Sequence, residues 1–210
     1  MKPPEIDRPQ PTDANAKKQT GKSMQDWFGV LDAEDALTAG RRKAIELLLA
    51  AGVGDDWWAT TIAVEHEKAR GAVERDGKPK GYAICVTKTV AVQLEDVYAA
   101  WTDPAALSEW FGPKCSVELA VGGRFENADG DRGEFKRIRE NKDLRFTWEN
   151  AARGAGSLVD VAFAAKPKGK TGITINHSRI QGRRDADELR ECWGIAMEGL
   201  KQILESGAGA

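Results

Sequence analysis

Residues 97–113, VYAAWTDPAALSEWFGP, predict two short helices separated by a sharp turn. In each helix the large apolar side chains recur at helical spacing and form one stripe, so both helices are expected to face a common core. Asp103-Pro104 interrupts the helical stretch, because proline disfavours helical backbone in the residue before it. Asp103 can then cap the second helix with Pro104 in its first turn, and Gly112-Pro113 ends that helix.

From residue 82 onward the apolar residues mostly alternate with period two, which is typical of strands with one buried face. The strands are expected at about residues 82–87, 115–121, 124–126, 133–139, 144–149, 157–165 and 172–179. A last helix over about residues 185–206 carries an apolar stripe formed by Leu189, Trp193, Ala196, Leu200 and Ile203. That stripe must pack on an apolar surface, and the concave face of the sheet is the large one available.

The N-terminal third has a different organisation. Residues 1–19 are rich in polar residues and proline and are expected to be a disordered leader. Residues 20–71 predict a small domain of three helices, and the charged, turn-rich residues 72–80 predict a linker. The main domain then spans residues 81–207. The expected fold class is α+β: a curved antiparallel sheet wrapped around a long C-terminal helix, preceded by three short helices.

Residues 97–113 resemble the signature of bacterial proteins named for similarity to the activator of Hsp90 ATPase, a branch of the SRPBCC (START-like, helix-grip) superfamily. The matching residue types are Val97, Trp101, Thr102, Asp103, Pro104, Leu107, Trp110, Phe111, Gly112 and Pro113. The resemblance continues through VGGRF at 121–125, GEFKRI at 133–138 and LRFTW at 144–148, and so covers about residues 82–206. It implies the helix-grip fold, which the strand and helix pattern predicts independently.

The segment over about residues 20–71 resembles a small helical domain of uncharacterised function that is appended to helix-grip domains in bacteria. The resemblance depends on Trp27-Phe28, on Trp57-Trp58 and on the closing Glu67…Arg70-Gly71. Adjacent tryptophans on a helix point about 100° apart, so one of the pair is expected to face a second surface. That surface is expected to be the helix-grip domain of the same chain, with a homodimer contact through the helical domain or a foreign partner as the alternatives.

Composition excludes several classes of function. The 210 residues carry a net charge of −2, which gives no electrostatic basis for binding nucleic acid. Three scattered cysteines without a CxxC pair favour a reducing cytoplasm, and no apolar run is long enough for membrane insertion. The two histidines have no ligand partner at i+3 or i+4, so neither a metal nor a cofactor is expected.

A sheet wrapped around a helix is expected to leave a cavity lined by apolar and aromatic side chains. The candidates are Trp110, Phe125, Phe135, Phe146, Trp148, Val161, Ile175, Trp193 and Met197. His177 shares the strand face of Ile173 and Ile175 and is the candidate polar residue of the cavity. His66, in the helical domain, is expected to be a helix-packing residue.

Three functions remain open from the sequence. The leading hypothesis is a non-enzymatic helix-grip domain that binds a small hydrophobic ligand between the sheet and the C-terminal helix, because no catalytic constellation is evident. The family name suggests a chaperone-linked module that contacts an Hsp90-type ATPase. The third hypothesis is a cyclase or hydrolase-like enzyme of the same superfamily, with His177 as the most obvious base.

Overall fold

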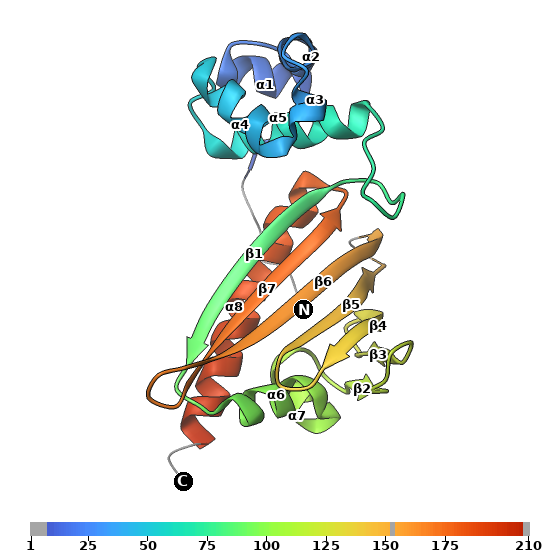
Figure 1. Cartoon of the computed structure of the whole chain (residues 1–210), viewed down its shortest axis with the longest axis vertical. Helices are drawn as coiled ribbons and strands as arrows, with labels where there is room; N and C mark the ends of the chain where they lie inside the picture. Colours follow the sequence, from blue (N-terminus) through green and yellow to red (C-terminus); the bar gives the residue numbers. More distant parts are fainter. Residues whose placement is uncertain (1–7, 152–153, 208–210) are drawn as a thin grey trace. The chain divides into compact units, whose positions relative to one another are not determined.

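A computed structural model describes residues 8–151 and 154–207 (Figure 1). Within these residues the chain divides into two units. The sheet unit comprises residues 83–180 and the chain from 185 onward, and the helical unit comprises residues up to 82 together with 181–184.

The sheet unit is built on seven antiparallel strands in the order β1-β7-β6-β5-β4-β3-β2. The strands are β1 (Tyr82–Val90), β2 (Ser116–Val117), β3 (Arg124–Glu126), β4 (Arg132–Arg139), β5 (Asp143–Asn150), β6 (Gly154–Lys166) and β7 (Lys170–Ile180). The longest pairing joins β6 to β7 from Leu158↔Ser178 to Lys166↔Lys170. Along β5 the buried Leu144, Phe146 and Trp148 alternate with partly exposed residues, as the period-two pattern predicted.

The three helices of the sheet unit are α6 (Leu94–Thr102), α7 (Pro104–Trp110) and α8 (Arg183–Gly207). The long helix α8 packs against the sheet. Its residues Leu189, Trp193, Ala196 and Leu200 are buried, because their spacing places them along one side of the helix. The α+β fold class predicted from the sequence is therefore confirmed.

One predicted strand is much shorter than expected. The strand expected over residues 115–121 is limited to Ser116–Val117, because the chain turns immediately afterwards. Ala120 N–H donates to the carbonyl of Glu118, and Gly123 N–H donates to the carbonyl of Ala120. Gly122 in this turn has a φ of 88°, which favours glycine.

The helical unit contains five helices among its described residues, not the expected three. They are α1 (Asp13–Thr20), α2 (Met24–Ala33), α3 (Ala36–Ala39), α4 (Arg41–Ala50) and α5 (Asp56–Ala69). The sequence predicted a helix over about residues 39–51; α4 begins at Arg41, because Gly40, with a φ of 90°, separates it from the unexpected α3.

The disordered leader expected over residues 1–19 is wrong for the residues from Asp13 onward, which form α1. Thr12 caps this helix and Gly21 ends it with a left-handed residue. Ala16 is fully buried, and the Thr20 hydroxyl accepts a hydrogen bond from Trp27 Nε1 at 2.7 Å. Small side chains thus anchor a helix that a count of large apolar residues could not find. The first seven residues lie outside the described part of the chain.

His66 packs in the helical unit, as expected. Its side chain is buried on α5, its ring centroid lies 5.5 Å from that of Phe28, and its Nε2 is 2.7 Å from Asp32 Oδ1. Arg70 also donates to Asp32, and this hydrogen bond, followed by that of His66, lowers the pKa of Asp32 to about 2. Of the tryptophan pair, Trp58 is buried and Trp57 is half-buried.

Candidate functional site

An apolar cavity lies in the sheet unit between the helices α6 and α7 and the strands β3 to β5. Its volume of about 20 Å³ is that of roughly one water molecule. The residues that line it, called the cavity wall below, are Trp101, Leu107, Phe111, Phe125, Phe135, Leu144 and Phe146. All seven are apolar or aromatic, so the cavity favours apolar contents.

The helical side of the cavity wall is positioned by the turn between α6 and α7. Asp103 accepts hydrogen bonds from the N–H groups of Ala105 and Ala106, both at 2.9 Å, and so caps α7 as predicted. Trp110 donates from Nε1 to the carbonyl of Ala100 at 2.9 Å, and its ring lies 4.7 Å from that of Trp101. These contacts hold α7 against the end of α6, where Trp101 forms part of the cavity wall.

The sheet side of the cavity wall is a cluster of three phenylalanines on adjacent strands. The ring centroid of Phe125 lies 5.0 Å from that of Phe146 and 5.8 Å from that of Phe135. Phe125 is paired with Gly133 across β3 and β4. A Cβ atom at Gly133 would lie 1.8 Å from the carbonyl oxygen of Thr147 and 2.5 Å from Phe125 Cε1. Glycine is therefore required for this ring to lie over its neighbouring strand.

Among the side chains of the cavity wall one polar atom occurs, the indole Nε1 of Trp101. It is buried and has no hydrogen-bond partner among the described residues. The Trp101 ring is stacked on Trp193 with an interplanar angle of 17° and a centroid distance of 6.1 Å. Burying an N–H group without a partner is costly, so this atom needs an explanation.

The nine residues predicted to line a cavity are distributed over two regions. Phe125, Phe135 and Phe146 belong to the cavity wall, and the other six do not. Trp110 is half-buried and packs on the outer side of Trp101. The remaining five are buried in the core of the sheet unit: Trp148, Val161, Ile175, Trp193 and Met197. This cavity lies under α6 and α7, and the cavity expected between the sheet and the C-terminal helix stays a prediction.

Four residues of the cavity wall were not predicted from the sequence: Trp101, Leu107, Phe111 and Leu144. Three of them lie in the stretch 97–113, where their helical spacing was interpreted as core packing only. The signal that could have found them is the turn at Asp103-Pro104, because a sharp turn holds the ends of two helices over the sheet without the packing of a continuous helix.

His177 is fully buried in a hydrogen-bonded chain and does not belong to the cavity wall. Trp193 Nε1 donates to His177 Nδ1 at 3.1 Å, so the proton of the neutral ring is on Nε2. Nε2 lies 2.8 Å from the Ser157 hydroxyl, which in turn donates to the carbonyl of Trp148 at 2.9 Å. Burial lowers the pKa of His177 to about 3. Both ring nitrogens are engaged, so the ring links sheet and helix and is not free to act as a base.

A second, polar hollow of about 360 Å³ lies at the β3, β4 and β5 end of the sheet. It is lined by Arg124, Phe125, Glu126, Arg132, Gly133, Glu134, Thr147 and Glu149. Its charges alternate in sign along and across the strands, and Arg132 pairs with Glu149 at 3.3 Å. Alternating charges of this kind are typical of a solvated sheet face.

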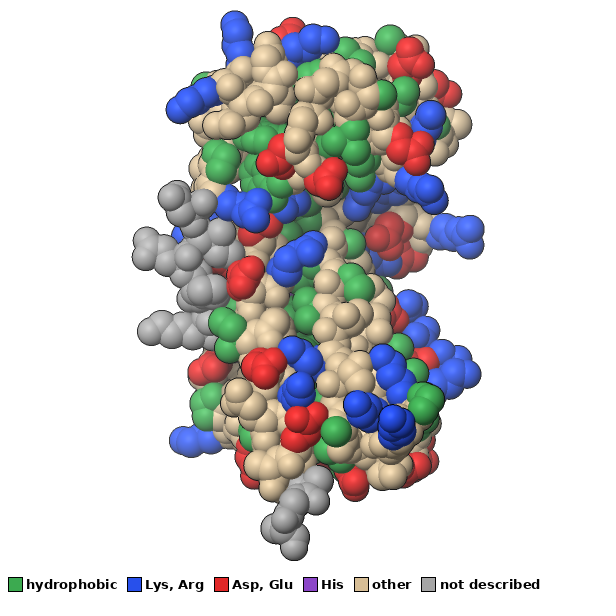
Figure 2. All heavy atoms as spheres, turned by 90° about the vertical axis from the view of Figure 1, so that its left-hand side faces the viewer, with side chains coloured by type: hydrophobic (Ala, Val, Ile, Leu, Met, Phe, Trp, Pro, Cys, Tyr) green, Lys and Arg blue, Asp and Glu red, His purple; other side chains and the backbone are tan. Residues whose placement is uncertain are grey.

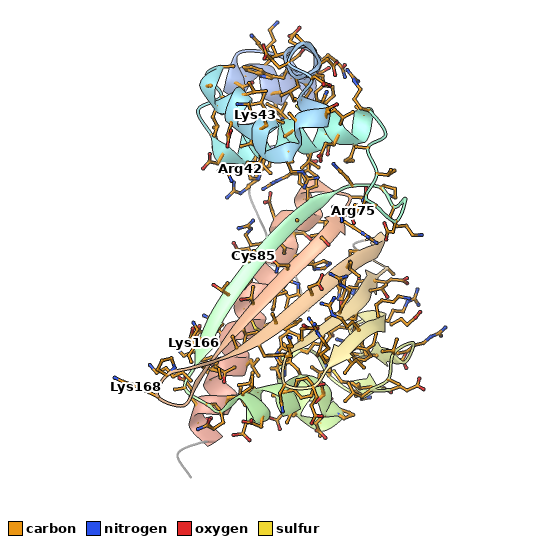
Figure 3. The ribbon with its side chains drawn as sticks, viewed as in Figure 1. Arg42, Lys43, Arg75, Cys85, Lys166 and Lys168 are labelled. Atoms are coloured by element: carbon orange, nitrogen blue, oxygen red, sulfur yellow. The ribbon has the colours of Figure 1, made fainter. Side chains whose placement is uncertain are left out.

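Basic side chains on separate elements have acidic or polar partners, as Arg42 and Lys166 illustrate. Figure 3 shows Arg42 and Lys43 on α4 and Lys166 at the end of β6. Arg42 pairs with Glu46 at 3.1 Å, and Lys166 donates to the Thr89 hydroxyl at 2.8 Å. On the face drawn in Figure 2, basic and acidic side chains are interspersed.

Metal-binding residues do not cluster in the described chain: no three His, Cys, Asp or Glu side chains there could hold an ion together. The three cysteines are free and differ in exposure. Cys85 on β1 is exposed and Cys192 is buried, and burial raises the pKa of the Cys115 thiol.

No helix in the described ranges has the length and apolar character needed to cross a membrane.

Comparison with known proteins gives one family and several similar folds. Residues 91–205 match the family described as Activator of Hsp90 ATPase homolog 1-like protein. An X-ray structure of a protein from Mesorhizobium loti is 26% identical, with 60% of this chain and 98% of that one covered and a TM-score of 0.54. No curated protein matches the sequence.

Two further structures are similar in fold. An HSP90 activator from Plasmodium falciparum is 24% identical, with 60% of this chain and 97% of that one covered and a TM-score of 0.51. The Aha1 dimer from Colwellia psychrerythraea is 18% identical, with 59% and 96% covered and a TM-score of 0.53. Because the family model matches more than half of the residues, the chain belongs to the Activator of Hsp90 ATPase homolog 1-like family of the SRPBCC superfamily.

Proposed function

We propose that the sheet unit binds a small apolar molecule in the cavity beneath α6 and α7. The observation that carries the proposal is the cavity wall: five aromatic and two leucine side chains from five different elements converge on one space. Aromatic rings at the edge-to-face angles seen here pack less completely than branched aliphatic side chains, which favours a space that a ligand can enlarge.

The cavity must widen to admit such a molecule, because ligand sites usually enclose about 300–1,000 Å³. Helix α7 is the element best suited to move. Among its own residues only Leu107 is buried, and Phe111 follows at its end. Exposing either side chain costs about 1.5–3 kcal/mol, which the burial of an apolar ligand can offset.

The proposal can be tested with the uncharged apolar dye N-phenyl-1-naphthylamine and a variant that fills the cavity. Dye fluorescence should rise to saturation with the wild type, and the affinity should fall at least tenfold in Leu107→Trp. Ile195→Trp is the matched control, because Ile195 on α8 is exposed and does not belong to the cavity wall. Equal dye binding by all three proteins, or none by the wild type, would refute the proposal.

The second candidate function is a chaperone-linked interaction. Leu119 and Val121 are 45% and 69% exposed in the turn between β2 and β3, which gives this unit a pair of neighbouring apolar side chains open to a partner. One structurally similar protein is described as an HSP90 activator. The ATPase rate of the organism's own Hsp90-type chaperone should then rise with the wild type and not with Leu119→Ser/Val121→Ser. A rate that is unchanged by the wild type removes this candidate.

A homodimer through the helical unit is proposed separately. It is supported by Leu37 on α3 and Leu49 on α4, two leucines that remain exposed on this unit. Native mass spectrometry should give a dimer mass for the wild type and a monomer mass for Leu37→Ser/Leu49→Ser. A monomeric wild type would contradict it.

The three free cysteines support our proposal of a cytoplasmic location.

A further inference from the structure

We infer that the ligand of this cavity is an uncharged, largely apolar molecule with one hydrogen-bond acceptor, which accepts from Trp101 Nε1–H. The inference depends on the proposed function and names the class of ligand for the same cavity. Ketones, esters and ethers of small ring or chain compounds fit this description. Carboxylates and alkylammonium ions do not, because the cavity wall contains no charged side chain to pair with them.

Three other tryptophans donate their indole N–H groups, whereas those of Trp101 and Trp148 are buried without a partner in the described chain. Trp27 donates to the Thr20 hydroxyl, Trp110 to the carbonyl of Ala100, and Trp193 to His177. The Nε1 atom of Trp101 has no such partner in the described chain although the side chain is only 4% exposed. Trp101 borders the cavity, so a ligand that enters the widened cavity can bring an acceptor to this ring.

A buried water molecule is a poor alternative partner. An internal water is held by about three hydrogen bonds to polar groups of the protein. The six other side chains of the cavity wall are leucine or phenylalanine and contain only carbon beyond the backbone. A water could therefore form one side-chain hydrogen bond here, whereas a ligand with a single acceptor would satisfy the indole and leave its apolar part against the phenylalanines.

Two probes of nearly the same shape test the inference: acetophenone, which has a carbonyl oxygen, and α-methylstyrene, which has a methylene group in its place. Both are titrated into full-length protein labelled with ¹⁵N, and the indole N–H signals are followed by NMR. The Trp101 signal is identified by its loss in Trp101→Phe. Trp148→Phe is the matched control, because Trp148 Nε1 is also buried without a partner in the described residues but does not border the cavity.

Acetophenone should move the Trp101 indole signal downfield and bind more tightly than α-methylstyrene, by roughly five- to a hundredfold. Trp101→Phe should abolish this preference, and Trp148→Phe should keep it. If both probes bind with equal affinity and the Trp101 signal shows no downfield shift, this inference is wrong while apolar binding stands. If neither probe binds, the proposed function fails and the inference fails with it.

Discussion

Lowering the pH should destabilise the sheet unit through a single buried side chain, His177. The ring is neutral in the folded protein, because it is fully buried, accepts from Trp193 and donates to Ser157. Protonation would place a second proton on Nδ1, opposite the N–H of Trp193, and would bury a charge. The folded state therefore resists a proton that the unfolded chain binds readily.

The sign and size follow from the two pKa values of His177, about 3 in the folded protein and 6.5 in the unfolded chain. Between these values the unfolded state binds one more proton, so the free energy of unfolding falls as the pH falls below 6.5. At 1.36 kcal/mol per pH unit the loss between pH 7 and pH 4 is about 3 kcal/mol.

The assay is urea unfolding at pH 7, 6, 5 and 4 for the wild type and for His177→Gln. The glutamine amide can accept from Trp193 and donate to Ser157 but does not titrate, so groups common to both proteins cancel in the comparison. Plots of the free energy of unfolding against pH should converge for the two proteins as the pH falls. Their slopes should differ by about 1.36 kcal/mol per pH unit, the value for one bound proton. Parallel plots would show that His177 does not cause the pH dependence. If the variant does not fold, the pKa of His177 can be measured by NMR in the wild type. A ring that becomes protonated above pH 5 would contradict the prediction.

Three further predictions concern local packing, capping and charge. Gly133→Ala should lower the free energy of unfolding in urea by about 1–3 kcal/mol or more, because the new Cβ would lie 1.8 Å from the Thr147 carbonyl oxygen. In the control Gly194→Ala on α8 the new Cβ meets nothing within 4 Å, so this change should be neutral or stabilising. Equal effects of the two substitutions would contradict the steric role of Gly133. Asp103→Ala should cost about 0.5–2 kcal/mol through the lost cap of α7, and an unchanged urea midpoint would exclude that role. Asp32→Asn should lower the thermal midpoint at pH 7, and the difference should vanish as the pH falls toward 2, where the wild-type carboxylate is protonated; a difference independent of pH would argue against the ion pair.

The sequence predicted the elements of the sheet unit because their signals are local. The aspartate cap at Asp103, the alternation along residues 144–149 and the stripe on α8 each depend on residues a few positions apart. The same kind of reasoning missed α1, whose burial is supplied by Ala16 and by the hydroxyl of Thr20. Such an anchor is visible only once its distant partner Trp27 is in place.

The position of the cavity could not be predicted in the same way. Strand phase correctly placed Phe125, Phe135 and Phe146 on the inner face, but it could not tell this region of that face from the region that His177 occupies. The distinction depends on where α6 and α7 cover the sheet. That is a tertiary property, which depends on contacts between residues far apart in the sequence.

The most direct test of apolar ligand binding is native mass spectrometry of the purified protein, followed by solvent extraction of whatever is released. We expect the wild type to show the mass of a small uncharged adduct, either as purified or after acetophenone is added. Leu107→Trp should show neither. A wild-type protein that has only its apo mass and takes up no acetophenone would exclude apolar ligand binding in this cavity.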